Sequence, residues 1–332
     1  MPGKKKAATT FADYLHGAGS LQADSFVGLL VMYSFRGARQ ANVARTAVEK
    51  QFADRDLDPN YIPPDPTAAQ AFLNSTGEKA RALSYRLGGQ SYFAEMKPVG
   101  SDRETITRAV MSYRVVDKKH LEGREVGTLT FFKQARGKPG SERVRFSIHD
   151  DRLHGSDERP ILEGWLNSIH ADYNWYKTYL YDQPIRQMVQ KYIEERLNGI
   201  KVLTSGGCYF VHRSRWDELR RLSEAVVALS PMFALNLCPL PDLPEMRDMI
   251  IEAYQDEIVD DVTSLVEKIE KFRASGRKVT GEVVSEFSGD VRGIASRAEE
   301  HSRVLDVSQD RTAGALESAY AVLAGLASQI ES

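Results

Sequence analysis

The pattern of apolar and polar positions is clearest between Ile200 and His212, where two β-prone apolar runs flank the polar and glycine-rich stretch Ser205-Gly206-Gly207. A Gly-Gly pair supplies the φ > 0 positions that a tight hairpin loop requires, and the aromatic and β-branched residues after it suit a pleated, half-buried surface. The sequence therefore predicts a β-hairpin with Gly206 and Gly207 as its turn glycines.

Apolar residues at helical spacing predict helices on both sides of this hairpin. They recur at intervals of three and four over 41–52, 67–83, 161–169, 184–197 and 216–229. The apolar run 25–34 is either a buried strand or a short core helix, because periodicity alone does not distinguish the two.

Strand-like patterns occupy the middle of the chain. The segments 105–116 and 126–134 are rich in β-branched and aromatic residues, and 143–148 alternates, with Val144, Phe146 and Ile148 on one face. Turns are expected at 117–123 and 136–140, so the three strands should form a small antiparallel β-meander.

The last part of the chain has a different pattern. After the Pro-rich break 239–244, apolar residues at 251, 254, 258, 262, 265, 269 and 272 predict a long amphipathic helix or coiled coil, and two further helical stretches follow over 279–305 and 312–330. Residues 244–332 carry 18 acidic and 10 basic side chains, which argues against contact with nucleic acid. This acidic helical region should pack on itself, on the core, or on a partner chain.

The patterns together predict an α+β fold. We expect a flexible segment over 1–24 and a core domain over 25–240, in which the β-meander and a helix–hairpin–helix, winged-helix-like unit lie among helices. An all-α, coiled-coil-like region over 244–332 then follows as a separate unit.

Composition indicates a cellular location but does not indicate a function. Lys and Arg (44) nearly balance Asp and Glu (46), so the overall charge requires neither a nucleic acid nor a membrane. The chain has two cysteines, Cys208 and Cys238, and so few cysteines are typical of proteins in a reducing compartment. No secretory signal and no transmembrane segment is expected, so a cytoplasmic location is predicted.

One loop has residues suited to a divalent metal ion. Between the last meander strand and the next helix lie two imidazoles and several carboxylates, and the candidate ligands are His149, Asp150, Asp151, His154 and Asp157. Because the histidines are five residues apart, they do not share one helical face. The alternative interpretation is a solvated loop.

Basic residues gather around the hairpin. From residue 186 to 221 there are eight Lys or Arg against four acids, and the candidate phosphate contacts are Lys201, Arg213, Arg215, Arg220 and Arg221. Here the hairpin would act as the wing of a winged-helix module. Alternatively, these arginines form the solvated rim of a helix–hairpin–helix core.

The stretch Thr204 to Val211, together with Tyr33-Ser34-Phe35 before a helix, resembles a family of uncharacterised proteins of phages and other mobile elements. In that family the hairpin reads Ser-Gly-Gly-Val-Tyr-Phe-Val-Pro, from which this chain departs at Cys208 and His212. The resemblance covers about residues 25–275 and implies a genomic context, with no activity attached.

The favoured function is therefore a non-enzymatic macromolecule-binding protein of a phage or mobile element. It would bind nucleic acid through 186–221 or a protein partner through 244–332. The alternatives are a metal-dependent hydrolase or nuclease that uses the His149–Glu158 loop, and a structural subunit that associates through its coiled coil. No cofactor and no membrane partner is predicted.

Overall fold

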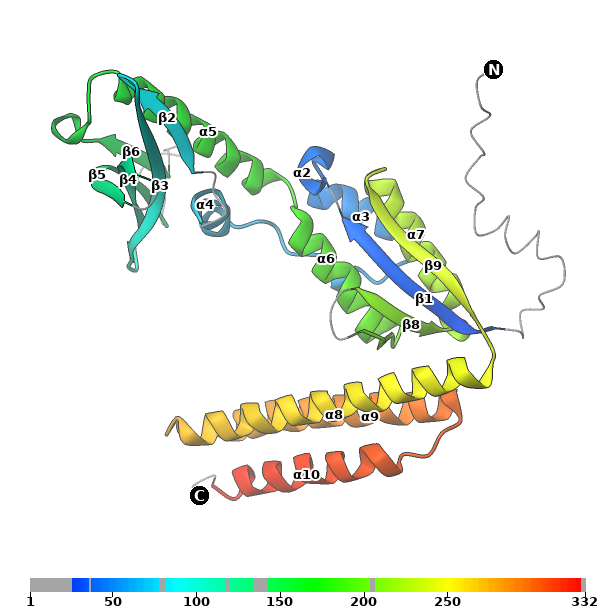
Figure 1. Ribbon diagram of the computed structural model, residues 1–332. Coiled ribbons are helices and arrows are strands. Elements are labelled where there is room, and N and C mark those ends of the chain that lie inside the picture. The colour runs from blue at the N-terminus through cyan, green and yellow to red at the C-terminus, as the bar shows by residue number, and fades with distance from the viewer. Residues whose placement is uncertain are drawn as a thin grey trace, which may run out of the picture. The chain divides into compact units, whose positions relative to one another are not determined.

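The computed structural model describes residues 26–35, 37–77, 82–117, 120–133, 143–203 and 207–329. Contacts divide the chain into two compact units: the first comprises residues up to 41, 47–62 and 182 onward, and the second comprises 42–46 and 63–181. The second unit is thus an insertion within the first. Both have the mixed α+β character that the sequence predicts (Figure 1). The segment 1–24, predicted to be flexible, lies outside the described residues.

A four-stranded antiparallel sheet forms the centre of the first unit. Its strands are β1 (Phe26–Phe35), β7 (Ile200–Lys201), β8 (Cys208–His212) and β9 (Phe233–Pro241), in the order β7-β8-β1-β9. Its helices are α2 (Ala38–Ala41), α3 (Arg45–Ala53), α6 (Asp182–Lys191), α7 (Trp216–Leu229), α8 (Pro244–Ala274), α9 (Gly281–Leu305) and α10 (Asp310–Ala327). Short 3-10 turns lie at Pro59–Tyr61 and Arg213–Arg215, and a π-helical turn lies at Tyr192–Arg196.

The order of these strands follows the split β-α-β arrangement of ferredoxin-like folds. Along the chain come a strand, helical crossover, two strands, a helix and a strand, and β1 lies between β8 and β9 in the sheet. The second unit is inserted in the first crossover, between β1 and β7. The apolar run 25–34, whose pattern fits either a strand or a helix, therefore forms the central strand β1.

The predicted hairpin exists, but it is not a free wing. Ile200 pairs with Phe210 and Lys201 with Tyr209, while β8 also pairs with β1, so the hairpin is part of the central sheet. Gly206 lies outside the described residues. Gly207 is not among the described glycines with a positive φ. It is needed for close packing instead, because a Cβ at this position would lie 2.6 Å from the Cζ of Tyr33.

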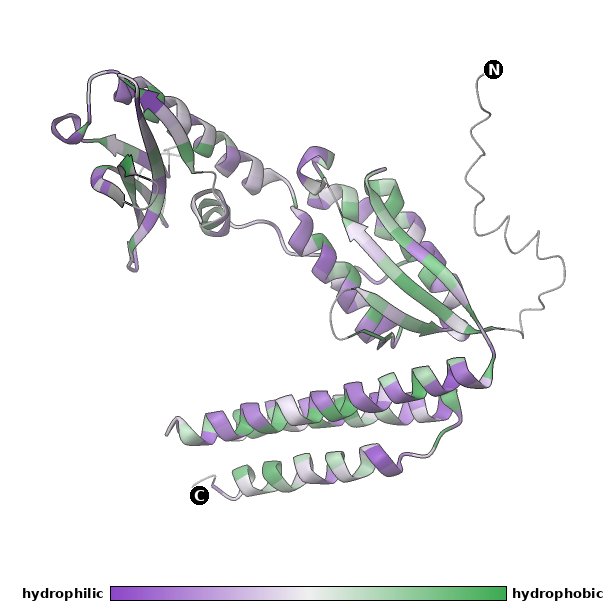
Figure 2. Ribbon diagram, in the orientation of Figure 1, coloured by the Kyte–Doolittle hydropathy of each residue, from purple (hydrophilic) through white to green (hydrophobic). Residues whose placement is uncertain are grey.

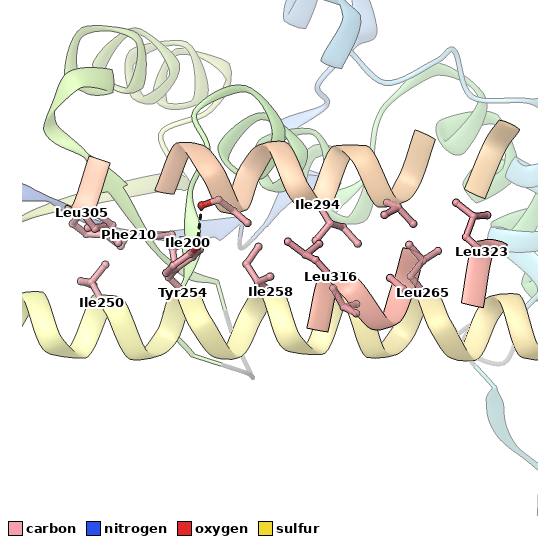
Figure 3. Packing of buried hydrophobic residues seen from close by; sticks show 14 of the residues in the cluster. Ile200, Phe210, Ile250, Tyr254, Ile258, Leu265, Ile294, Leu305, Leu316 and Leu323 are labelled. Carbon is pink, nitrogen blue, oxygen red and sulfur yellow. Dashed lines mark hydrogen bonds between the residues drawn. The ribbon is translucent and has the colours of Figure 1, made fainter. Parts of the chain in front are cut away.

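Helices α8, α9 and α10 pack on one another and on one face of this sheet. Their buried apolar residues form one cluster with Val27, Ile200, Phe210 and Leu240 of the strands, as Figure 3 shows for Ile200 and Phe210. Figure 2 shows hydrophobic and hydrophilic residues alternating along the three helices, as their amphipathic sequences require. In the interior, the Tyr254 hydroxyl donates to the carbonyl of Ala298 over 2.9 Å.

The division of the chain therefore does not fall at 240–244. The apolar stripe predicted on α8 is buried at Tyr254, Ile258 and further along the helix. These residues belong to the same hydrophobic cluster as Ile200 and Phe210 of the sheet. The Pro-rich break is largely strand, since β9 runs to Pro241. Among the described strands, β9 is an edge strand that pairs with β1, and an edge is where a sheet tolerates proline.

The second unit is built on a five-stranded antiparallel meander. Its strands are β2 (Leu83–Leu87), β3 (Gln90–Ser101), β4 (Thr105–Asp117), β5 (His120–Phe132) and β6 (Val144–Ile148), paired in sequence order. Helices α4 (Ala68–Thr76) and α5 (Glu158–Thr178) cover one face, and a 3-10 turn lies at Asp150–Arg152. The last three strands confirm the predicted meander, whereas the turn expected at 136–140 lies outside the described residues.

The helix predicted over 67–83 ends at Thr76, and β2 and β3 follow where no strands were expected. Their connection is Gly88-Gly89, with φ values of +53° and +83°, as a two-residue hairpin turn of this type demands. The Gly-Gly argument thus applies to this pair and not to Gly207. No helix in the described ranges has the length and apolarity needed to cross a membrane.

Candidate binding cleft

A cleft of about 240 Å³ opens in the second unit between α5 and β6. The residues that line it come from α4, β5, β6 and α5, and they are Phe72, Ser75, Leu129, Val144, Arg145, Phe146, Leu166, Asn167, Ile169, His170 and Tyr173. Most of these residues are apolar, and Ser75, Asn167 and His170 add polar groups. This is the usual composition of a binding site.

The alternation of β6 places Phe146 at this cleft. Val144 and Phe146 lie on the sheet face that α4 and α5 cover, and Val144 is buried, whereas Phe146 is 40% exposed. On α5, Leu166, Ile169 and Tyr173 follow helical spacing and form the buried face that meets the sheet. A partly exposed aromatic ring therefore lines the cleft beside α5.

Strand β6 is the last strand of its sheet in the described part of the chain. Toward β5, the backbone of Phe132 donates to Arg143 and that of His149 donates to Val126, each over 2.8 Å. In an antiparallel ladder the residues that bond to the neighbouring strand alternate with residues that do not. By this register, the N–H and C=O groups of Val144, Phe146 and Ile148 point away from β5, to the free edge.

Tyr173 has a buried hydroxyl that lacks a hydrogen-bond partner among the described residues, although the side chain lines the cleft. Burial raises the pKa of this hydroxyl, and the positive charge of Arg143 acts in the opposite direction. The Lys177 ammonium lies 5.2 Å from the centre of the Tyr173 ring, and the His170 ring stacks at 6.1 Å. A buried polar group of this kind calls for an explanation, and an acceptor supplied by a ligand would satisfy it.

The charge around the cleft is one-sided. Of the described residues that line it, Arg145 is charged and none is Asp or Glu. Neither Arg143 nor Arg145 forms an ion pair with another described residue, and the Arg145 guanidinium lies 5.6 Å from the centre of the Phe132 ring. The described lining of the cleft therefore has no negative charge, and the side chain of Arg145 lies on the opposite side of the sheet, over Phe132.

The five candidate metal ligands do not converge. Asp150 pairs with Arg159, His149 approaches Glu125 at 3.9 Å, and the hydroxyl of Ser156 donates to Asp157. The His154 ring lies on Tyr92 at 4.7 Å, and burial lowers its pKa. No contact of the Asp151 side chain joins it to the other four. Within the described ranges, no group of three His, Cys, Asp or Glu residues could hold a metal ion.

The chemically distinctive residue of this loop is the one that ends it. Glu158 is fully buried and accepts hydrogen bonds from the hydroxyl of Ser112 over 2.7 Å, from the hydroxyl of Tyr85, and from the backbone N–H of His154. Burial and the neighbouring carboxylate of Glu158 raise the pKa of Tyr85. With its lone pairs satisfied by donors from the sheet and the loop, Glu158 fastens the start of α5 to the meander.

The basic residues around the hairpin are largely engaged within the chain. Arg215 contacts Glu300 over 3.0 Å, Arg220 contacts Glu224 over 3.3 Å, and Arg221 lies 3.9 Å from Asp56. Arg213 also has a partner. Among the described residues, Lys201 forms no ion pair, and its backbone N–H donates to Glu257. These side chains thus do not form one unpaired basic surface.

Sequence reasoning did not find the cleft, although part of its signal was visible. The alternation over 143–148 correctly placed Val144, Phe146 and Ile148 on one face, and the other face carries Arg143 and Arg145. The missing information was the neighbour of β6. An edge strand and an inner strand have the same alternation, so only the pairing of the whole sheet shows which edge is free.

A family model described as "Family of unknown function (DUF6744)" matches residues 26–332. No curated protein and no solved structure matches the chain.

Proposed function

We propose that this chain, which belongs to the family of unknown function DUF6744, is a non-enzymatic protein that binds an extended segment of a partner protein along β6. The segment would add a strand to the sheet of the second unit. The observation that carries this proposal is that the free edge of β6 lies directly beside the cleft of α5. Strand addition is a recurring mode of peptide recognition, in which main-chain hydrogen bonds give affinity and adjacent pockets give specificity.

The chemistry of the cleft supports the same function. A strand paired with β6 would satisfy the outward N–H and C=O groups of Val144, Phe146 and Ile148. The side chain opposite Phe146 would lie on the face of the cleft, within the region lined by Phe146 and Tyr173. An acceptor there would receive the hydroxyl proton of Tyr173, which otherwise has no described partner.

The two binding regions expected from the sequence support the function less well. Most of the candidate residues in 186–221 are neutralised by acids of the same chain, which weakens the case for phosphate contact there. The helices of 244–332 bury their apolar stripes within the chain, so a partner is not needed to cover them. A phage or mobile-element setting stays a prediction that rests on the resemblance alone.

The proposal is tested by removing one edge donor. In Phe146→Pro the lost N–H points away from β5, and proline is tolerated on an edge strand, so the ladder of the sheet should survive. The matched control is Phe146→Val, which also loses the ring but keeps the N–H. Peptides of about nine residues, a typical strand length, are selected from a random library on the full chain, and their affinities for the two variants are compared.

We expect the selected peptides to bind the Phe146→Val variant and not the Phe146→Pro variant. The two variants should have equal midpoints of thermal unfolding. A second measurement covers the case in which the proline variant unfolds. In the parent chain, bound peptide should slow hydrogen exchange at Val144, Phe146 and Ile148. Peptides that bind without protecting any of these amides would show that strand addition is not the mode of binding.

A further inference from the structure

We infer that the segment bound along β6 is acidic, with carboxylates opposite Arg143 and Arg145 and a hydrogen-bond acceptor facing Tyr173. This inference rests on the proposed function and specifies its ligand. It comes from the two faces that β6 presents to an added strand.

On one face, β6 presents two arginines. Arg145 follows the buried Val144, so it lies on the other side of the sheet, where its guanidinium is 5.6 Å from the centre of the Phe132 ring. Arg143 precedes β6 and continues the same alternation. Residues of an added strand that lie directly opposite them would have their side chains on the same side. Opposite-charge pairs in this position stabilise cross-strand pairing, and like charges destabilise it. Alternate Asp or Glu residues in the ligand would therefore match this edge.

On the other face, the cleft favours an acceptor. Tyr173 has a hydroxyl to donate, His170 lines the same cleft, and Lys177 lies over the Tyr173 ring. No described acidic residue lines the cleft to compete for these donors. A carboxylate or amide oxygen on the inward-facing side chain of the ligand would pair the buried hydroxyl, and a basic side chain would not.

A nucleic acid is a weaker match to this site. Its phosphates could contact the two arginines, but a sugar–phosphate backbone has no alternating N–H and C=O groups to continue the ladder of β6. A single-stranded oligonucleotide is therefore one of the outcomes that the experiment must separate.

The experiment uses the full chain and three labelled peptides of about nine residues, in which Val alternates with Glu, with Thr or with Lys. Two opposite-charge pairs of up to about 1 kcal/mol each should make the Glu peptide bind about tenfold more tightly than the Thr peptide, and the Lys peptide should bind most weakly. The preference should decrease with added salt, because the pairs are exposed to solvent. Labelled oligothymidylate is measured in parallel.

Matched variants locate the effect. Arg145→Glu should abolish the preference for the Glu peptide, whereas Arg86→Glu should leave it unchanged. Arg86 is the appropriate control because it is also exposed on an edge strand of the same sheet, on the opposite edge. Tyr173→Phe should weaken binding of a peptide whose inward central residue is Asn, and should not affect the same peptide with Val there.

The outcomes separate the inference from the function on which it rests. Equal affinity for the three peptides, with β6 amides protected in each complex, would overturn the acidic ligand and leave strand addition standing. Failure of all peptides to bind would overturn both. Oligothymidylate that binds more tightly than any peptide and loses affinity in Arg145→Glu would replace the acidic peptide by a nucleic acid.

Discussion

The backbone N–H of Lys201, in β7, donates a hydrogen bond to a carboxylate oxygen of Glu257, in α8, over 3.0 Å. Burial raises the pKa of Glu257 to about 7, while that hydrogen bond and the charge of Arg297 act to lower it. Asp261 and Glu194 raise it further. The contact joins a strand of the central sheet to the first helix of the C-terminal bundle, so its protonation affects the stability of the first unit.

Glu257 and His301 have opposite effects on stability as pH changes. An unfolded Glu ionises near 4.5 and Glu257 near 7, so the unfolded state binds fewer protons between these values and stability falls as pH rises. Burial lowers the pKa of His301 from 6.5 to about 4, with Arg297 acting in the same direction and Glu300 against it. The contribution of neutral His301 to the free energy of unfolding is therefore fully present above pH 6.5 and is lost as pH falls toward 4.

We therefore predict two opposite profiles from two single variants. The reference is the double variant Glu257→Gln with His301→Gln. Relative to it, Glu257→Gln keeps His301, and its free energy of unfolding should increase as pH rises from 4 to 6.5. His301→Gln keeps Glu257, and its free energy of unfolding should decrease as pH rises from 4.5 to 7. Neither slope should exceed about 1.4 kcal/mol per pH unit. Urea unfolding across this range measures both. Parallel profiles for the three variants would contradict the assignment.

Removal of the C-terminal helices should unfold the first unit. A chain that ends at Leu243 exposes Val27, Ile200, Phe210 and Leu240, which are buried against α8, α9 and α10. Each large apolar side chain loses roughly 1.5 to 3 kcal/mol of burial, a large share of the stability of an ordinary domain. Binding of a hydrophobic dye and the unfolding midpoint report the change. An unaltered midpoint would restore the separable tail that the sequence suggests.

Two glycines of α9 should be replaceable with a gain in stability. Apart from the adjoining backbone of α9 itself, a Cβ at Gly289 or Gly293 would have no atom within 4 Å, and both positions lie inside the helix. Glycine costs roughly 1 kcal/mol relative to alanine in such a position. Gly289→Ala and Gly293→Ala should each raise the free energy of unfolding by about this amount. A loss of stability in either variant would contradict the open space that the structure shows at that position.

Alanine at Gly207 should have the opposite effect. The added methyl group would lie 2.6 to 3.0 Å from carbon atoms of the Tyr33 ring, which stacks on Tyr209 at 6.1 Å. We expect Gly207→Ala to destabilise the chain by about 1 kcal/mol or more, as overpacking does. The control is the same substitution in a Tyr33→Leu background, where the ring is absent. An equal loss in both backgrounds would point to the backbone of the loop and not to the ring.

Local patterns predicted much of the secondary structure but not the assembly. Alternation and helical spacing identified β6 and α7 because both depend on neighbouring residues alone. The pairing of β1 with β8 and β9 depends on residues far along the chain, so no local pattern indicates that the second unit is an insertion. For the same reason the prolines of β9 suggested a break, although an edge strand accommodates them.

The candidate sites differ for a related reason. His149, Asp150, Asp151, His154 and Asp157 are neighbours in sequence, but the turn at Asp150–Arg152 directs several of them to separate partners. Tyr173 and Phe146 are far apart in sequence and meet only because α5 covers the meander. A composition-based search finds the first kind of cluster and cannot find the second.

The inserted position of the second unit favours an order of folding. Leu30, in β1, must wait for Phe210 and Cys238 before its sheet can form, whereas the meander and α5 are complete in the growing chain by Thr178. During synthesis the second unit can thus fold first. Its folding brings Val43 beside Leu180, which are bridged in the structure, and this shortens the loop that separates β1 from its partners. Mutations that slow the folding of the meander should accordingly delay the central sheet, although none of its residues has changed.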